Sequence, residues 1–76
     1  MNNEEKVRKS SAFQNVIEEF CKEFNFETED VESSVEIDYG STLVHVESKE
    51  NSEIYRNYLF LWDEEKNEFV ANKFYY

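Results

Sequence analysis

Apolar residues in the first third of the chain recur at the spacing of one helical face. The positions i, i+3, i+4, i+7, i+8 and i+11 are Phe13, Val16, Ile17, Phe20, Cys21 and Phe24. Ser11 and Gln14 have the spacing of a capping box, and Asn25 is a favourable stop signal. The pattern predicts an amphipathic helix over residues 11–25, preceded by a polar segment, residues 1–9, that we expect to be frayed.

The next stretch alternates between apolar or small residues and polar residues, which is typical of half-buried strands. The polar positions of its first strand are Glu32, Ser34, Glu36 and Asp38. Gly40-Ser41 suits a two-residue type II′ turn, which predicts a hairpin over residues 31–47. This turn implies the pairs Tyr39–Thr42, Ile37–Val44, Val35–Val46, Asp38–Leu43, Glu36–His45 and Ser34–Glu47. Thr28 could instead cap a short turn, and the strand would then begin near Ser34.

The last third predicts a second hairpin, closed by the turn sequence DEEKN with Asn67 in the left-handed conformation. Pairing Trp62 with Phe69 divides the side chains between two faces, both of them apolar. One face would carry Tyr58, Phe60, Trp62, Phe69, Ala71 and Tyr75. The other would carry Leu59, Leu61, Val70 and Phe74, with Tyr55 and Tyr76 at its end.

The predicted fold is α+β: an N-terminal amphipathic helix followed by a four-stranded antiparallel β meander, in a single domain of residues 1–76. A chain of this length supports only one small core. One helix covers one face of such a sheet, so the second apolar face needs another cover. We therefore expect a homodimer, whose interface would contain Leu59, Leu61, Val70 and Phe74.

Cysteine usage and hydropathy indicate a cytoplasmic protein. The single cysteine, Cys21, lies in the apolar helical stripe and reads as a buried thiol in a reducing compartment. No apolar run approaches the ~18 residues of a membrane span, and the N-terminal sequence lacks a signal-peptide core. We expect the protein in the cytoplasm, which would be the host cytoplasm if the chain is viral, and we expect no membrane partner.

Residues able to carry catalysis or hold a metal are scarce. His45 is the only histidine, and no serine or cysteine nucleophile is placed near it by the sequence. Zinc sites need three or four Cys or His ligands, and EF-hand loops need a mid-loop glycine among spaced acids. Paired carboxylates do acid–base work in a cleft, which a strand face does not provide. We therefore expect no enzymatic activity, no catalytic residue, no metal and no cofactor.

Charge is distributed unevenly along the chain. The formal net charge is −10, and residues 18–53 carry all of it, with twelve acidic residues against Lys22 and Lys49. Like charges placed close together on a sheet cost roughly 0.2–1 kcal/mol per pair, which a small domain can hardly spare. This concentration favours a binding surface over a merely solvated face. The expected binding residues are Glu27, Glu29, Asp30, Glu32, Glu36, Asp38, Glu47, Glu50 and Glu53.

The spacing of these carboxylates is on the scale of the phosphates in DNA. Residues two apart on a strand are separated by roughly 6.6–6.8 Å, and each DNA strand carries one charge per ~3.4 Å of axis. Strong negative potential also steers a basic partner to the complex. The expected partner is a basic DNA-binding host protein, and we expect no direct binding of nucleic acid.

In size, charge and aromatic content the whole chain resembles the small acidic DNA-mimic proteins that phages make for host takeover. Members of this class occupy the DNA-binding sites of HU-type nucleoid proteins, uracil-DNA glycosylases, restriction enzymes or CRISPR nucleases. The resemblance is closest in type to inhibitors of HU-type proteins, which implies inhibition of such a protein by an acidic dimer. The glycosylase inhibitors use a Glu-Ser-Ile element, whereas here Glu32-Ser33 is followed by Ser34.

Two other functions stay open from the sequence. The chain could be an anti-restriction, anti-CRISPR or glycosylase inhibitor that acts by the same mimicry. It could instead be a non-enzymatic assembly module, or a module that binds a transcription factor, with its aromatic hairpin as the contact surface. Salt dependence separates these cases, because an acidic contact weakens as ionic strength rises whereas an apolar contact does not.

Overall fold

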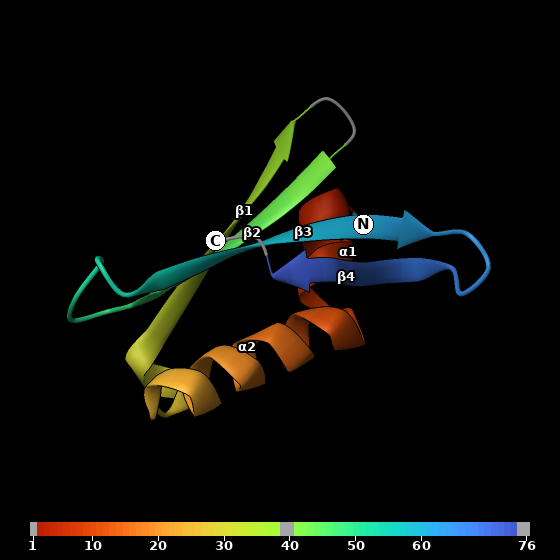
Figure 1. Cartoon of the computed structure of the whole chain (residues 1–76). Coiled ribbons are helices and arrows are strands. Elements are labelled where there is room, and N and C mark those ends of the chain that lie inside the picture. Colours follow the sequence, from red (N-terminus) through yellow and green to blue (C-terminus); the bar gives the residue numbers. More distant parts are fainter. Residues whose placement is uncertain (1, 39–40, 75–76) are drawn as a thin grey trace.

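The computed structural model describes residues 2–38 and 41–74, with the backbone alone at residues 38, 73 and 74. Its elements are the helices α1 (Asn3–Arg8) and α2 (Ser11–Phe24), the 3-10 turn η1 (Thr28–Asp30), and the strands β1 (Val31–Asp38), β2 (Ser41–Ser48), β3 (Tyr55–Asp63) and β4 (Glu68–Phe74). The strands form one antiparallel sheet in the order β1-β2-β3-β4, and α2 runs below it in Figure 1. The predicted α+β fold, a helix followed by a four-stranded antiparallel meander, is confirmed.

Helix α2 begins one residue away from the predicted cap and ends at the predicted stop residue. Its N-cap is Ser10, whose hydroxyl oxygen accepts a hydrogen bond of 3.2 Å from the Phe13 backbone N–H. The predicted cap, Ser11, is wrong by one residue, because Ser11 already has helical geometry. Asn25, the predicted stop, ends the helix, and it does so in the left-handed conformation with φ 61°.

The expectation of a frayed segment at residues 1–9 is wrong, because residues 3–8 form α1. Asn2 caps this helix by accepting a 2.8 Å hydrogen bond from the Glu5 N–H, and Val7 is fully buried in the core. The Arg8 guanidinium donates to the hydroxyl and the carbonyl oxygen of Ser33, at 3.2 and 3.3 Å, which ties α1 to β1. The hydropathy pattern missed α1 because a single apolar residue, Val7, anchors so short a helix.

The predicted register of the first hairpin is wrong by two residues. The structure pairs Ile37 with Thr42, Glu36 with Leu43 and Ser34 with His45. Asp38 pairs with Ser41, so the residues between the strands are Tyr39 and Gly40. The turn predicted at Gly40-Ser41 is wrong at Ser41, which belongs to β2, and its other residue lies outside the described part. Because side chains alternate with period two, a slip of two residues leaves every side chain on its predicted face.

The strand β1 begins at Val31, as the alternation predicts, and the alternative start near Ser34 is wrong. A 3-10 turn does precede the strand, but its N-cap is Glu27 and not Thr28. The strand then begins directly at Val31.

The second hairpin has the predicted register at its turn and a different register farther on. Trp62 pairs with Phe69, and Asn67 has φ 57°, as predicted. An irregularity between Leu59 and Phe60 then shifts the ladder by one residue, so that Phe74 lies opposite Tyr58. The sequence pattern gave no sign of this bulge.

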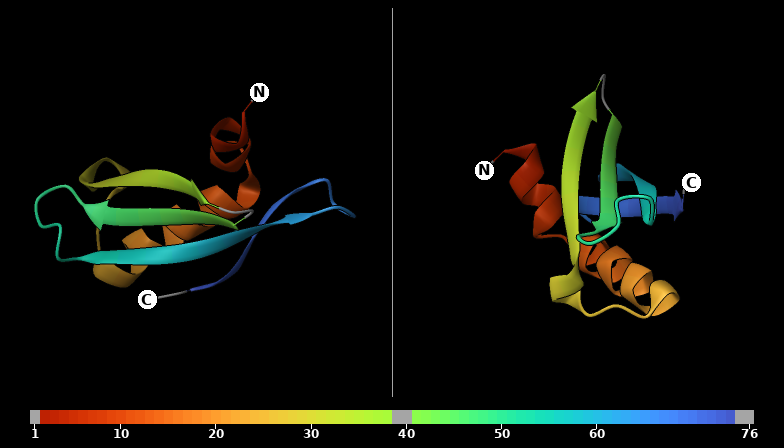
Figure 2. Two further views of the ribbon diagram at one scale, coloured as in Figure 1. Left: turned by 90° about the horizontal axis from the view of Figure 1, so that it is seen from above. Right: turned by 90° about the vertical axis from the view of Figure 1, so that its left-hand side faces the viewer.

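The core lies between the two helices and one face of the sheet, which we call the inner face. Its fully buried side chains include Val7 of α1, Phe20 of α2, and Val44, Val46 and Phe60 of the strands. We call the opposite face the outer face; the buried core side chains of both helices pack on the inner face, and α2 reaches the β4 edge of the outer face through the hydrogen bond of Ser11 to Glu68. Figure 2 shows the β3–β4 hairpin reaching beyond the β1–β2 hairpin, so one end of the sheet is formed by β3 and β4 alone.

Candidate functional site

Acidic side chains from three segments gather at the end of the sheet where β1 begins and β2 ends. The backbone N–H of Lys49 donates to the carbonyl oxygen of Asp30 at 3.0 Å, which joins η1 to the β2–β3 loop. Figure 1 shows both segments on the same side of the molecule. We call this region the acidic end; it comprises Glu27, Glu29, Asp30, Glu32, Glu47, Glu50 and Glu53, with Lys49 as the one basic residue.

Local hydrogen bonds fix the backbone of the acidic end. The buried Ser48 hydroxyl oxygen accepts from the N–H groups of Glu50 and Asn51, both at 3.3 Å. The Asn51 side-chain oxygen accepts from the Glu53 N–H at 3.0 Å, which closes the loop. In η1, the Asp30 carboxylate accepts from the Glu27 N–H at 2.9 Å. The acids therefore stand on an ordered backbone, with every side chain of the acidic end except Glu47 exposed.

The outer face of β1 and β2 carries a carboxylate pair and a histidine. Glu32 lies directly opposite Glu47 in the ladder. The Nε2 atom of His45 is 2.7 Å from the Glu47 Oε1, and its Nδ1 atom is 2.8 Å from the Asn57 Oδ1. The His45 ring also stacks on Tyr55, with 5.3 Å between ring centroids. His45 is therefore held by neighbours on β2 and β3, and the predicted neighbour Glu36 is wrong because of the register.

The remaining two predicted binding residues lie away from the acidic end. Glu36 is exposed on the outer face and sits opposite Leu43. It stands four residues along β1 from Glu32, about 13 Å away at the usual strand rise. Asp38 comes later still, and its side chain lies outside the described part. The structure thus brings together seven of the nine predicted residues and separates Glu36 from them.

Four aliphatic residues lie together farther along the outer face, between Glu36 and the pair Asp63–Glu68. Leu43 lies opposite Leu59 across β2 and β3, and Leu61 lies opposite Val70 across β3 and β4. We call these four residues the aliphatic patch. Leu61 is 41% exposed, and the other three are half-buried. The sequence pattern predicted three of them as an interface and missed Leu43, although Leu43 alternates with the buried Val44.

Phe74, the remaining residue predicted for the dimer interface, cannot be assigned to the patch. Its backbone lies opposite Tyr58, and its side chain is outside the described part.

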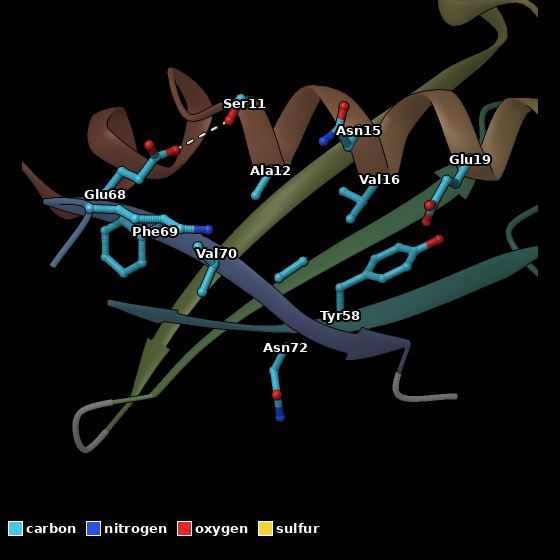
Figure 3. Close-up of a pocket in the computed structure, with 12 residues that line it drawn as sticks. Ser11, Ala12, Asn15, Val16, Glu19, Tyr58, Glu68, Phe69, Val70 and Asn72 are labelled. Atoms are coloured by element: carbon cyan, nitrogen blue, oxygen red, sulfur yellow. Dashed lines mark hydrogen bonds between the residues drawn. The ribbon is translucent and has the colours of Figure 1, made fainter. Parts of the chain in front are cut away.

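A groove of about 500 Å³ lies between α2 and β4, and Figure 3 shows its lining. At one end the Ser11 hydroxyl donates to the Glu68 carboxylate at 3.2 Å. At the other end the side chains of Glu19 and Tyr58 point toward each other. Burial, followed by the nearby negative charges of Glu23 and Glu19, raises the pKa of Tyr58 to about 12. The described lining of the groove contains neither histidine nor cysteine.

Candidate chemical groups elsewhere are dispersed. Cys21 is buried, and burial together with the charges of Asp30 and Glu27 raises the pKa of its thiol, which disfavours the reactive thiolate. His45 is held on the outer face of the sheet, away from this core cysteine. Over residues 2–38 and 41–74, no three Cys, His, Asp or Glu side chains converge as metal ligands. The acidic end is thus the feature best suited to a function, because it concentrates negative charge on the surface.

Comparison with known proteins does not assign the chain to a family. No protein-family model, curated protein or solved structure matches the chain. Within the part of the chain that the structure describes, no helix has the length and apolar character needed to cross a membrane.

Proposed function

We propose that the protein is a non-enzymatic DNA mimic, which inhibits a basic protein by occupying its DNA-binding surface with the acidic end. The observation that carries this proposal is the convergence of seven acidic residues with one lysine on a hydrogen-bonded backbone. Such an arrangement presents several negative charges in fixed positions, as a phosphate backbone does. A surface of this kind attracts a basic protein and repels DNA.

The direct opposition of Glu32 and Glu47 supports a binding role over a solubility role. Like charges opposite each other on a sheet destabilise the fold, and solubility requires no such pairing. The half-buried Glu47 is also oriented by its 2.7 Å contact with His45. A carboxylate with a fixed position makes a geometrically specific contact with a lysine or arginine of the partner.

The favoured target is an HU-type nucleoid protein, on the resemblance in size and charge described above. Restriction enzymes, CRISPR nucleases and glycosylases are alternative targets of the same mechanism. We also propose that the chain acts in the cytoplasm. We further propose that it forms a homodimer, because its outer sheet face carries the aliphatic patch without a covering helix.

The test is a competition experiment. An HU-type protein bound to a labelled DNA duplex is titrated with this protein, and the released duplex is measured by gel shift. We expect release of the duplex and no shift of the duplex by this protein alone. A shifted duplex in the absence of the HU-type protein would show direct DNA binding and would exclude the mimic. Parallel capture from a bacterial lysate at low and high salt would identify a different basic target.

A matched pair of variants makes the test specific to the acidic end. The first variant changes Glu29, Glu32 and Glu50 to Gln, and the control changes Glu5, Glu64 and Glu65 to Gln. All six residues are exposed, and both variants change the net charge by the same amount. We expect the first variant to lose most of its ability to release DNA and the control to keep it. Equal losses would mean that only the overall field acts, and no loss would refute the proposed site.

A further inference from the structure

The two edge strands of the sheet, β1 and β4, differ in how their backbone is covered. At the β1 edge, the Arg8 guanidinium of α1 donates to the carbonyl oxygen of Ser33 at 3.3 Å. At the β4 edge, no hydrogen bond from another segment reaches the backbone of residues 68–72, among the residues that the structure describes. An edge strand directs the N–H and C=O groups of every second residue away from the sheet. The β4 edge therefore offers backbone groups that are ready to pair with another strand.

The groove between α2 and β4 follows this edge. Five consecutive residues of β4, Glu68–Asn72, line one wall, and the other wall is formed by Ser11, Ala12, Asn15, Val16 and Glu19 of α2. Because successive side chains of a strand point to opposite faces, a groove lined by consecutive residues lies along the edge of that strand. The groove thus contains the open backbone of β4.

The two walls run in the same direction and match in length. Ser11 donates to Glu68 at one end, and Glu19 points toward Tyr58 at the other, as Figure 3 shows. The helical wall from Ser11 to Glu19 is about 12 Å long at the usual rise. The strand wall from Glu68 to Asn72 is about 13 Å long. The groove therefore has the length of four or five residues of an extended chain.

We propose that this groove binds an extended segment of a partner protein, which adds a fifth, antiparallel strand to the sheet beside β4. In this mode of recognition, hydrogen bonds between the two backbones provide affinity, and the adjoining side chains provide specificity. The α2 wall supplies the side chains. Ala12 and Val16 are small and apolar, so they leave room for apolar side chains of the segment that point toward the helix.

The charges along the groove select a segment with a lysine or arginine at its Glu19 end. The charged residues of the lining are Glu19, Lys66 and Glu68. Lys66 and Glu68 balance each other at one end, whereas Glu19 at the other end forms no ion pair with the described side chains. The nearby charges on α2 are also balanced, because Glu18 lies near Lys22, and Glu23 pairs with Arg56 at 2.6 Å. A basic side chain therefore has one matching partner in the groove, Glu19.

A fluorescein-labelled peptide of seven alternating lysine and valine residues is the probe, and its fluorescence anisotropy measures binding at physiological salt. With the valines directed toward α2, one set of alternate peptide N–H groups faces β4 and the other set faces solvent. Two isomers, N-methylated on one set or the other, separate strand addition from charge attraction. One isomer should bind like the parent, and the other should bind at least about tenfold more weakly. Equal affinities of the two isomers, or no saturable binding of the parent, would overturn the proposal.

A matched pair of variants tests the position of the bound peptide. Asn15→Arg fills the groove with a long side chain, whereas Gln14→Arg places the same side chain on the same helix outside the groove lining. Both residues are exposed. We expect Asn15→Arg to weaken binding at least about tenfold and Gln14→Arg to change it little. For the charge, Glu19→Gln should weaken binding more than Glu18→Gln does. Equal effects within either pair would contradict the assigned groove.

Amide hydrogen exchange identifies the strand that pairs with the peptide. Alternate amides within residues 68–72 should become protected when the peptide is added. Protection of the same amides in the free protein, increasing with its concentration, would show that a second copy occupies the edge and would overturn the proposal.

The peptide site does not rest on the proposed function. The variant with Glu29, Glu32 and Glu50 changed to Gln should therefore bind the peptide like the wild type, even though it fails to release DNA.

Discussion

Glu32 and Glu47 lie directly opposite each other on β1 and β2, and within the described residues only Glu47 has a hydrogen-bonding partner, the Nε2 atom of His45 at 2.7 Å. The two carboxylates therefore differ in their contribution to the fold. Glu32 repels Glu47 and is exposed, so Glu32→Gln should raise the free energy of unfolding by roughly 0.2–1 kcal/mol. Urea denaturation measures this change.

Glu36→Gln is the control for this substitution. Glu36 lies on the same strand and the same face, but its ladder partner is Leu43. We expect its unfolding midpoint to stay near that of the wild type. Glu47→Gln relieves the same repulsion as Glu32→Gln but weakens the contact with His45, so it should stabilise the protein less. Equal stabilisation by all three changes would point to a general charge effect.

The first helix provides a second prediction, which concerns stability alone. Val7 is fully buried although it belongs to a helix of only six residues. Val7→Ala removes two buried methyl groups and should lower the free energy of unfolding by about 2 kcal/mol. The exposed neighbour Lys9 is the control, and Lys9→Ala should have little effect. Thermal unfolding would contradict this role of α1 if the two variants melted together.

The sequence predicted those parts of the fold that depend on periodicity. The stripe from Phe13 to Phe24 and the alternation around Val44 identified α2 and the strands, and Asn25 and Asn67 marked a helix end and a turn. These signals are local, because each depends on residues a few positions apart. They also sorted the residues of the first hairpin correctly between two faces, although the register of this hairpin was wrong.

The parts that the sequence missed depend on contacts between distant segments. Helix α1 is held by Val7 in the core and by the hydrogen bonds of Arg8 to Ser33. The periodicity of the sequence does not predict either of these contacts. The site shows the same division. The acidic residues of the site could be identified from the sequence by their negative charge. The separation of Glu36 from them follows from the register of the strands. The contact between η1 and the β2–β3 loop follows from a hydrogen bond between Lys49 and Asp30.

Alkaline pH should destabilise the fold through Tyr58. Its pKa in the folded protein is about 12, raised from the ordinary value of 10.0 by burial first and then by nearby glutamates. The folded state thus holds the phenol proton more tightly than the unfolded chain does. The resulting stability is fully present below pH 10.0 and is lost as the pH rises through about 12.

Tyr58→Phe isolates this effect, because it keeps the ring and removes the titrating group. Between about pH 8 and about pH 11 the wild type should lose roughly 1–2 kcal/mol more unfolding free energy than the variant. Urea denaturation at both pH values gives the comparison. Parallel losses in the two proteins would show that other groups cause the alkaline instability.

The binding surface itself gives the last prediction, which compares Glu29 with Glu36. Both are exposed glutamates, but Glu29 belongs to the acidic end, whereas Glu36 stands about 13 Å farther along β1 than Glu32. This separation exceeds the Debye length of about 8–10 Å at physiological salt, so Glu36 contributes little to a contact centred on the acidic end. Glu29→Gln should therefore weaken competition with DNA for an HU-type protein more than Glu36→Gln does. Competition titrations at several salt concentrations measure both variants.

Glu29→Gln should also flatten the salt dependence of binding, because one ion pair fewer is formed, while Glu36→Gln leaves the slope unchanged. If the two variants behaved alike at physiological salt, the partner would have to contact the whole length of β1, and the acidic end would not be the site.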